Sequence, residues 1–403
     1  MSTASHRRSS KSSGKYFAGL TPNTFLLAFS SLFADVSTEM LYPVLPVFLT
    51  QTLGASASAV GLIEGVATSI QNITQGFSGW LSDRLRRRKW VALPGFVLAA
   101  ISKPIIGFAT GWPLVLMARS LDRFGSGMRS APRDALVAES ADEKHRGKAF
   151  GLEGFGDNLG ACLGPLIAIA LISLAHVGER TIFFLSIIPG ALAALMVLFV
   201  REKRGPARAE KKLDLGFRNF PRAYWKYLLA TALFGFGNSS NSFLILRTKD
   251  LGASLILTIF IYALYNLVAA ISSFPAGHLS DRLGRKRVLL VSFLVFVVAY
   301  AGFGFASNIV AIAALFAVYG LYQGIFRAVG KALATDFLPS HLHASGIGWF
   351  TMTIGLSGLV ASIVAGQLWT RMGPRATFLY GATCALAGSV ALAALVPNTE
   401  PRP

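Results

Sequence analysis

Long apolar runs alternate with short polar segments along almost the whole chain. Each run holds about 20 residues or more, which is enough for a helix to cross a bilayer. The pattern therefore predicts an all-α integral membrane protein with twelve transmembrane helices in two six-helix bundles. The predicted spans are 22–50, 57–82, 90–109, 112–139, 146–175, 181–200, 223–249, 255–280, 287–306, 308–337, 343–370 and 376–396.

The second half of the chain repeats the first. The segment 79–89, GWLSDRLRRRK, returns 198 positions later as 277–287, GHLSDRLGRKR, and each copy closes a long apolar run. Duplication of a membrane unit is a common way to build secondary transporters. The two predicted six-helix bundles cover 21–200 and 223–397, and a cytoplasmic linker, 201–222, joins them. A disordered cytoplasmic tail, 1–20, precedes the first bundle, and a short cytoplasmic tail, 398–403, follows the second.

Composition and charge support a membrane protein and orient it. Of the 403 residues 53% are hydrophobic and 14% charged, which is too apolar for an ordinary soluble domain. The net charge of +19 arises mainly in the N-terminal tail, in the linker and after the second, fourth and eighth spans. By the positive-inside rule both termini are cytoplasmic. Basic residues in short loops favour lipid headgroups, not nucleic acid, as partners.

The two motif copies, the twelve spans and the basic linker together resemble the major facilitator superfamily across essentially the whole chain. The resemblance implies a latch on the cytoplasmic side. The first copy departs from the family pattern because Arg86 stands where the family has glycine. The implied gate residues are Gly79, Asp83, Arg84 and Arg87 in the first copy and Gly277, Asp281, Arg282 and Arg285 in the second.

Two further elements resemble patterns of this family. The segment 119–125, RSLDRFG, aligns with its Arg-x-x-Gln-Gly-x-Gly pattern, so Arg119 takes the place of the arginine linked to proton coupling. Asp122 and Arg123 replace the Gln and the first Gly. In the fifth span Gly160, Gly164 and Pro165 are similar to an element common among the family's antiporters. This glycine element favours export. The continuation of the fourth span, 127–136, GMRSAPRDAL, looks like a bacterial branch of the superfamily, which implies a bacterial inner membrane.

Charged residues inside the spans are the first candidates for function, because a charge at bilayer depth costs several kcal/mol unless it is paired or hydrated. For proton coupling we select Asp35, Glu39, Arg119, Asp122 and Arg123. A permanent salt bridge between helices is the alternative for each of them. Toward the cytoplasmic gate, structural pairing is favoured for Arg129, Arg133, Glu153 and Asp157, and Asp134 is a further candidate gate residue.

The resemblance also implies a central cavity lined by the first, fourth, seventh and tenth spans. Candidate cavity residues are Asn238, Asn241, Tyr262, Tyr265, Arg327 and Lys331. Hydrogen bonds between packed helices are the alternative for the two asparagines. Arg327 and Lys331 lie on one helical face, and three partners stay open for them: an anionic group on a substrate, a lipid phosphate, or Asp134 or Glu139 across the gate.

These observations predict a proton-coupled secondary transporter that moves a small organic or amphipathic solute by alternating access. Export by proton antiport is preferred, and proton-coupled uptake of an organic anion is the alternative. A membrane enzyme or a channel is a distant alternative, because the sequence has no HExxH and no GxxxxGK[ST] loop. We expect no metal and no cofactor, with the proton gradient as the energy source. The expected partners of a monomeric chain are the small-molecule substrate, protons and membrane lipids.

Overall fold

The computed structural model describes residues 20–85, 87–141, 146–202, 220–339 and 342–398. Most of the predicted linker and nearly all of the two predicted tails therefore lie outside the described residues, as does Arg86. Six side chains within the helices lie outside them as well: those of Trp80, Asp83, Arg146, Phe274, His343 and Ala344.

The first half is helical wherever an apolar run predicted a span. Its first span ends in a short helix and one π-helical turn, and its sixth span divides at Ser186, three residues before Pro189, whose ring nitrogen carries no hydrogen to donate. The elements are α1 (Pro22–Leu41), α2 (Leu45–Val47), η1 (Phe48–Thr52), α3 (Ala57–Leu85), α4 (Arg88–Gly107), α5 (Trp112–Glu139), α6 (Arg146–Leu174), α7 (Glu179–Leu185) and α8 (Ile187–Phe199).

The second half follows the same plan with one difference. The run 223–249, predicted as one span, is broken between Gly235 and Ser242. A Cβ atom at Gly237 would overlap the carbonyl of Gly381, so the chain there needs glycine to approach the neighbouring helix. The elements are α9 (Arg222–Gly235), α10 (Ser242–Asp250), α11 (Leu255–Leu283), α12 (Arg285–Phe305), α13 (Ile309–Asp336), α14 (His343–Met372) and α15 (Pro374–Leu395).

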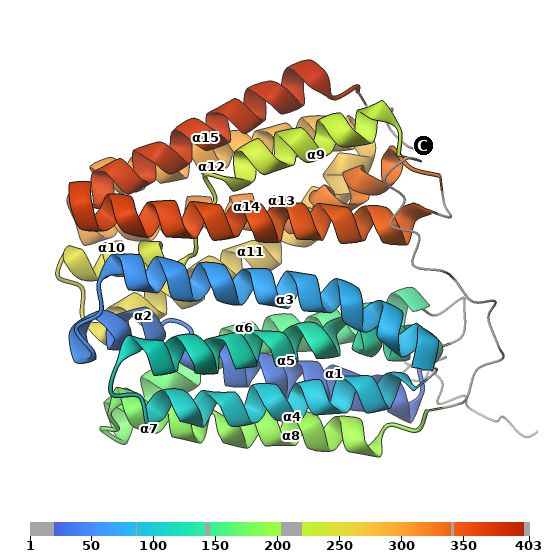
Figure 1. Cartoon of the computed structure of the whole chain (residues 1–403), viewed down its shortest axis with the longest axis horizontal. Helices are drawn as coiled ribbons and strands as arrows, with labels where there is room; N and C mark the ends of the chain where they lie inside the picture. Colours follow the sequence, from blue (N-terminus) through green and yellow to red (C-terminus); the bar gives the residue numbers. More distant parts are fainter. Residues whose placement is uncertain (1–19, 86, 142–145, 203–219, 340–341, 399–403) are drawn as a thin grey trace, which may run out of the picture.

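Nine helical segments in the described part of the chain are both long enough and apolar enough to cross a membrane. The predicted spans missing from that set correspond to α3, α5 and the α9–α10 pair. α5 carries the buried Arg119, Asp122 and Arg129, and α9 and α10 are each short. All three nevertheless run alongside their neighbours through the bundle (Figure 1).

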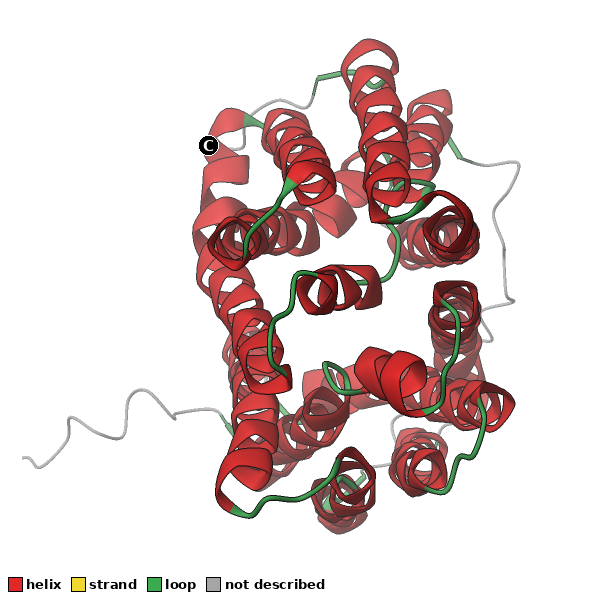
Figure 2. Ribbon diagram, turned by 90° about the vertical axis from the view of Figure 1, so that its left-hand side faces the viewer, coloured by secondary structure: helices red, strands yellow, loops and turns green. Residues whose placement is uncertain are grey.

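The two halves form two layers of roughly parallel helices (Figure 1). The first half packs through α1 against α6 and α4 against α5, and the second through α11 against α13 and α12 against α15. Figure 2 shows the helices nearly end-on in these two groups. We call the end of the bundle where the described chain begins and ends the terminal face, and the other end the opposite face.

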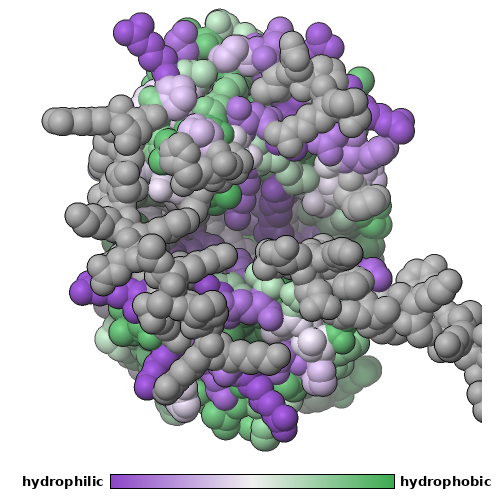
Figure 3. All heavy atoms as spheres, turned by 90° about the vertical axis from the view of Figure 1, so that its right-hand side faces the viewer, coloured by the Kyte–Doolittle hydropathy of each residue, from purple (hydrophilic) through white to green (hydrophobic). Residues whose placement is uncertain are grey.

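The halves touch each other along α3 and α14. Near the opposite face, the Ser58 hydroxyl donates to the Gly366 carbonyl at 3.1 Å, and the hydroxyls of Ser58 and Thr370 lie 2.9 Å apart. Deeper in the bundle, Ser69 donates to the Gly355 carbonyl at 2.9 Å. From the terminal face, Figure 3 shows a hollow between the halves with hydrophilic residues at its base. The structure is therefore closed at the opposite face and open at the terminal face.

A row of glycines on α6 brings that helix close to α1. A Cβ atom on Gly160 would lie 2.8 Å from the Cβ of Asp35, and one on Gly164 would lie 2.8 Å from the Cβ of Glu39. Small residues spaced four apart permit such close approach between membrane helices. The glycines of the antiporter-like element thus lie directly against the two carboxylate residues of the first span.

Replacing Gly164 with alanine should destabilise the protein, because the new methyl group has no room beside Glu39 and Met40. Overpacking of this kind costs about 1–3 kcal/mol. The measurement is the thermal unfolding midpoint of the purified protein in detergent. Gly154→Ala on the same helix is the control, since nothing lies within 4 Å of a Cβ there. Equal midpoints for the two variants would contradict the packing argument.

Candidate functional site

Arg119 lies at the centre of a group of charges buried inside the first half. Its side chain is fully buried, as is that of Asp122, and Glu64 is 3% exposed. The Nε atom of Arg119 lies 3.0 Å from Glu64 Oε1, and its Nη1 atom lies 2.9 Å from Asp122 Oδ2. Two carboxylates from α3 and α5 therefore neutralise the arginine that the family pattern singles out.

Two more cations complete this buried charge cluster, which we define as Glu64, Lys103, Arg119, Asp122 and Arg123. Lys103 Nζ donates to the Ser37 hydroxyl at 2.8 Å and lies 3.8 Å from Asp122 Oδ1. Arg123 Nε lies 3.6 Å from Asp122 Oδ2. The cluster thus sets three cations around two carboxylates. The sequence analysis did not select Lys103, although a lone lysine in the apolar run 90–109 was a usable signal.

The cluster reaches the second half through an aromatic contact. The guanidinium of Arg119 lies 5.4 Å from the ring centre of Tyr42, which stacks on Tyr262 at 5.5 Å. Tyr262 donates its hydroxyl hydrogen to Glu39 Oε2 at 3.0 Å, and the hydroxyls of Tyr42 and Ser240 lie 3.3 Å apart. We call Glu39, Tyr42, Ser240 and Tyr262 the inter-half latch, because its bonds join α1 to α11 and to the break between α9 and α10.

Asp35 lies one helical turn from Glu39 toward the terminal face. It is partly exposed, and within the described residues it forms no ion pair or side-chain hydrogen bond. Its charged neighbours are Asp157, Arg129, Glu39 and Arg133. A carboxylate with nearby charges and access to water can gain or lose a proton more easily than one fixed in a salt bridge.

Arg129 is buried against the ring of Phe96, with 4.6 Å between the guanidinium carbon and the ring centre. Its Nε and Nη1 atoms have no hydrogen-bond partner within the part of the chain that the structure describes. Phe96 belongs to α4 of the same half. Within the described residues, Arg129 forms no ion pair with the second half, and the ring that it packs against belongs to its own half.

The remaining charges near the terminal end of α5 pair within the first half. Arg133 Nη2 lies 2.8 Å from Glu153 and 3.0 Å from Asp134. Its Nη1 atom lies 3.5 Å from Asp157 and donates to Ser31 at 3.0 Å. These predicted gate residues thus join α1, α5 and α6 to one another.

The repeated motif makes the same contact in both halves, but with a shift of one residue. In the second copy Arg285 pairs with Asp336 at 2.6 Å and donates to the Ala332 carbonyl at 3.0 Å. The corresponding contacts in the first half, to Glu139 at 2.6 Å and the Ala135 carbonyl at 3.2 Å, belong to Arg88. Alignment of the motifs predicted Arg87 at this place, and the structure shows Arg87 exposed at the start of α4.

The other motif residues differ in their surroundings. A Cβ atom on Gly79 would lie 3.2 Å from the Cβ of Ala131, whereas one on Gly277 would meet open space. Arg84 and Arg282 are exposed. Asp281 pairs with Arg285 at 3.2 Å. The side chain of Asp83 lies outside the described part, so its role in the cytoplasmic gate stays a prediction.

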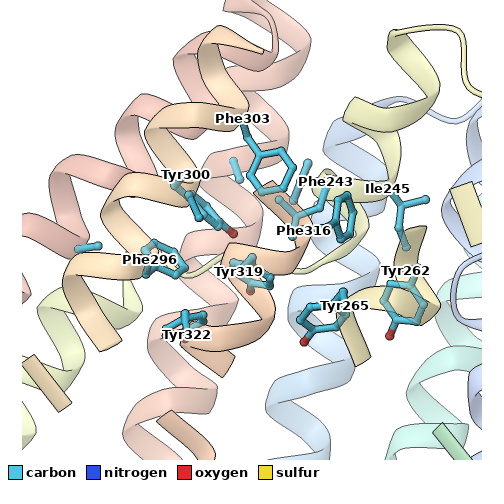
Figure 4. Packing of buried hydrophobic residues seen from close by; sticks show 14 of the residues in the cluster. Phe243, Ile245, Tyr262, Tyr265, Phe296, Tyr300, Phe303, Phe316, Tyr319 and Tyr322 are labelled. Atoms are coloured by element: carbon cyan, nitrogen blue, oxygen red, sulfur yellow. The ribbon is translucent and has the colours of Figure 1, made fainter. Parts of the chain in front are cut away.

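The two asparagines of the broken seventh span bind tyrosines of their own half. Asn238 donates to the Tyr322 hydroxyl at 2.9 Å, and Asn241 donates to Tyr265 at 3.2 Å and accepts from Tyr319 at 2.8 Å. Figure 4 shows these tyrosines together beside the break. Sequence analysis missed Tyr319 and Tyr322, because both lie in a run that looks uniformly apolar.

Arg327 and Lys331 are exposed on one face of α13. The charged neighbours of Arg327 are Glu39 and Asp35 on α1 of the other half, and Tyr262 and Tyr265 lie close to it too. Arg327 therefore faces α1 across the hollow. Since side chains four apart share a helix face, Lys331 lies on the same side one turn closer to the terminal face.

A two-layered bundle of membrane helices with a polar hollow between its halves, open at one face and closed at the other, has the architecture of a secondary transporter. A family model for the Major Facilitator Superfamily matches residues 27–246 and 227–403. The chain belongs to this superfamily and is a multi-pass membrane transporter, not an enzyme.

Individual proteins agree with this assignment. An uncharacterised MFS-type transporter of Methanocaldococcus jannaschii is 34% identical over 379 residues, which cover 93% of this chain and 94% of that protein. A probable 4-methylmuconolactone transporter of Cupriavidus pinatubonensis is 28% identical over 372 residues, which cover 87% of this chain and 84% of that protein. The crystal structure of the nucleoside transporter NupG superposes with a TM-score of 0.75 at 16% identity, covering 93% of this chain and 99% of that one, which shows a shared fold.

Proposed function

We propose that the protein is a proton-coupled secondary transporter that exports a small organic or amphipathic solute in exchange for protons. The observation that carries the proposal is Asp35, a partly exposed carboxylate in the first span with no ion pair to any described residue. Its proton affinity changes as water and neighbouring charges change, so it can take up a proton on one side of the membrane and release it on the other.

Alternating access fits the state that the structure captures. In the other state the seam of Ser58, Ser69 and the inter-half latch would separate, and the terminal face would close. Glu39 is part of the inter-half latch, so a change in its charge would act directly on this contact between the halves. Asp35 lies one helical turn away, so a change in its charge would act on Glu39 through the electrostatic interaction of the two carboxylates.

Export and orientation rest on further features. The antiporter-like glycines lie against Asp35 and Glu39, so this element supports the same region that we assign to proton exchange. The distribution of Lys and Arg favours an orientation with both termini in the cytoplasm. The membrane that we propose is a bacterial inner membrane. In that orientation the hollow opens to the cytoplasm and receives solute there. We propose that the chain acts as a monomer in contact with anionic lipids.

The test is flux of a diverse panel of labelled organic compounds in proteoliposomes with an imposed pH gradient. Wild-type protein should drive at least one compound against its gradient, and Asp35→Asn should abolish the driven flux while leaving exchange at equal pH. Asp250→Asn, which changes an exposed carboxylate at the end of α10, is the control. Wild-type flux that ignores the pH gradient would refute proton coupling, and driven flux that survives in Asp35→Asn would place the coupling elsewhere.

A further inference from the structure

The hollow contains two cations that no described carboxylate neutralises at close range. Arg327 and Lys331 are exposed, and neither forms an ion pair or a hydrogen bond with any residue that the structure describes. An exposed arginine on the lipid side of a membrane helix would be costly. The position of Arg327 opposite Glu39 and Asp35 instead places its exposed guanidinium in the hollow.

Three carboxylates near the terminal face that could have closed onto these cations are bound to other cations. Asp134 pairs with Arg133, Glu139 with Arg88, and Asp336 with Arg285. Of the three partners that the sequence left open, the pairing across the gate is therefore absent from this state. An anionic group that enters the hollow remains as the partner.

The chemistry of the two cations defines what they would bind. A guanidinium presents N–H donors in a planar fork that matches a carboxylate with two parallel hydrogen bonds. A lysine ammonium adds a mobile point charge, and one helical turn, about 5.4 Å, separates it from the arginine along the helix. A carboxylate whose two oxygens accept hydrogen bonds from Arg327 can therefore also be attracted by the charge of Lys331.

We propose that Arg327 and Lys331 form the binding site for the anionic group of the transported solute, and that the solute is a small organic carboxylate. This inference rests on the proposed function, which makes the hollow the place where the transported solute binds. It does not depend on the direction of transport, because an anion carried outward or inward meets the same two side chains. A phosphate of a lipid headgroup has related chemistry, so the test must separate the two sources.

The experiment measures equilibrium binding to the full-length protein in phosphatidylcholine nanodiscs by saturation-transfer NMR titration. The probes are three pairs of equal shape, each an acid anion and its neutral amide: benzoate and benzamide, nicotinate and nicotinamide, hexanoate and hexanamide. For at least one pair the anion should bind about tenfold more tightly than the amide, a factor that corresponds to ~1.4 kcal/mol.

Variants assign the preference to the two residues. Arg327→Gln with Lys331→Met should remove the preference for the anion, and Arg327→Lys should retain part of it because charge remains without the fork. Arg371→Gln, an exposed arginine in the last turn of α14 at the opposite face, should leave it unchanged. Because the readout is a ratio between two probes on one sample, a loss of folded protein lowers both signals and does not imitate the result.

Several outcomes would overturn the proposal. It fails if anion and amide bind alike for every pair, or if the preference survives in the double variant. The proposal also fails if none of the three anions binds to the wild-type protein and the headgroup phosphate of added phosphatidylglycerol contacts Arg327 and Lys331. In that event the two cations bind a lipid. Binding is measured without a proton gradient, so a preserved anion preference in a protein with no gradient-driven flux would refute only the proposed function.

Discussion

Replacing Arg119 with methionine should lower the free energy of unfolding by about 3–5 kcal/mol, the cost of removing one member of a buried ion pair. The change leaves Glu64 and Asp122 with no partner of comparable closeness, since the next cation, Arg123, lies 3.6 Å from Asp122. Both carboxylates are almost fully buried, so water cannot compensate. The measurement is SDS-induced unfolding of the purified protein in mixed micelles.

Removing the stranded charge should restore stability. The variant that combines Arg119→Met with Glu64→Gln removes the carboxylate that loses its ion pair, while Asp122 keeps Arg123 at 3.6 Å and Lys103 at 3.8 Å. Neutral replacement of a buried ionic group is often tolerated. We expect it to recover more than half of the loss while transport stays abolished. Stability unchanged in the single variant would mean that water reaches the cluster. A double variant no more stable than the single one would mean that the shape of Arg119 matters more than its charge.

Replacing Tyr262 with phenylalanine should shift the protein toward a state open at the opposite face. The change removes one hydrogen bond to a carboxylate, a kind of bond that contributes about 1.5–3 kcal/mol, and it keeps the ring that stacks on Tyr42. Since ~1.4 kcal/mol is a tenfold change in an equilibrium, the open state should gain at least about tenfold in population.

Cysteine labelling can report this shift, because the chain has only two cysteines to replace, Cys162 and Cys384. Ser362 is 3% exposed at the seam near the opposite face, so a Ser362→Cys thiol should react with a membrane-impermeant maleimide only when the seam opens. Tyr265→Phe is the matched control, since Tyr265 lies nearly one turn away and binds Asn241 of its own half. Equal labelling rates in Tyr262→Phe and Tyr265→Phe would show that the latch does not hold the seam.

The sequence allowed most of the fold to be predicted, because a bilayer admits few structures. A long run of apolar residues without charge forms a helix there, and so α12, predicted over 287–306, spans Arg285–Phe305. The break between α9 and α10 could not be predicted in the same way. It depends on the close approach of Gly237 to Gly381, which are 144 positions apart in the chain.

Candidate residues could be found from the sequence, but their partners could not. Helical periodicity places Asp35 and Glu39 on one face of α1 without saying which helix that face meets. The partner of Glu39 is Tyr262, 223 positions away, and the main partner of Arg119 is Glu64 on α3 and not an acid of α1 or α6. Such pairings depend on how helices rotate and stack, which distant packing decides.

The shift between Arg88 and Arg285 bears on how the two halves have diverged. α3 ends at Leu85 and α4 begins at Arg88, whereas α11 ends at Leu283 and α12 begins at Arg285, with Gly284 between them at a φ of 90°. Two positions separate the helices in the first copy, and a single glycine with a positive φ separates them in the second. Both units nevertheless form the same contact between a basic residue and the end of the fourth helix of the unit. A change of one residue in the length of the connection has therefore moved the contact to the next position of the motif without removing it.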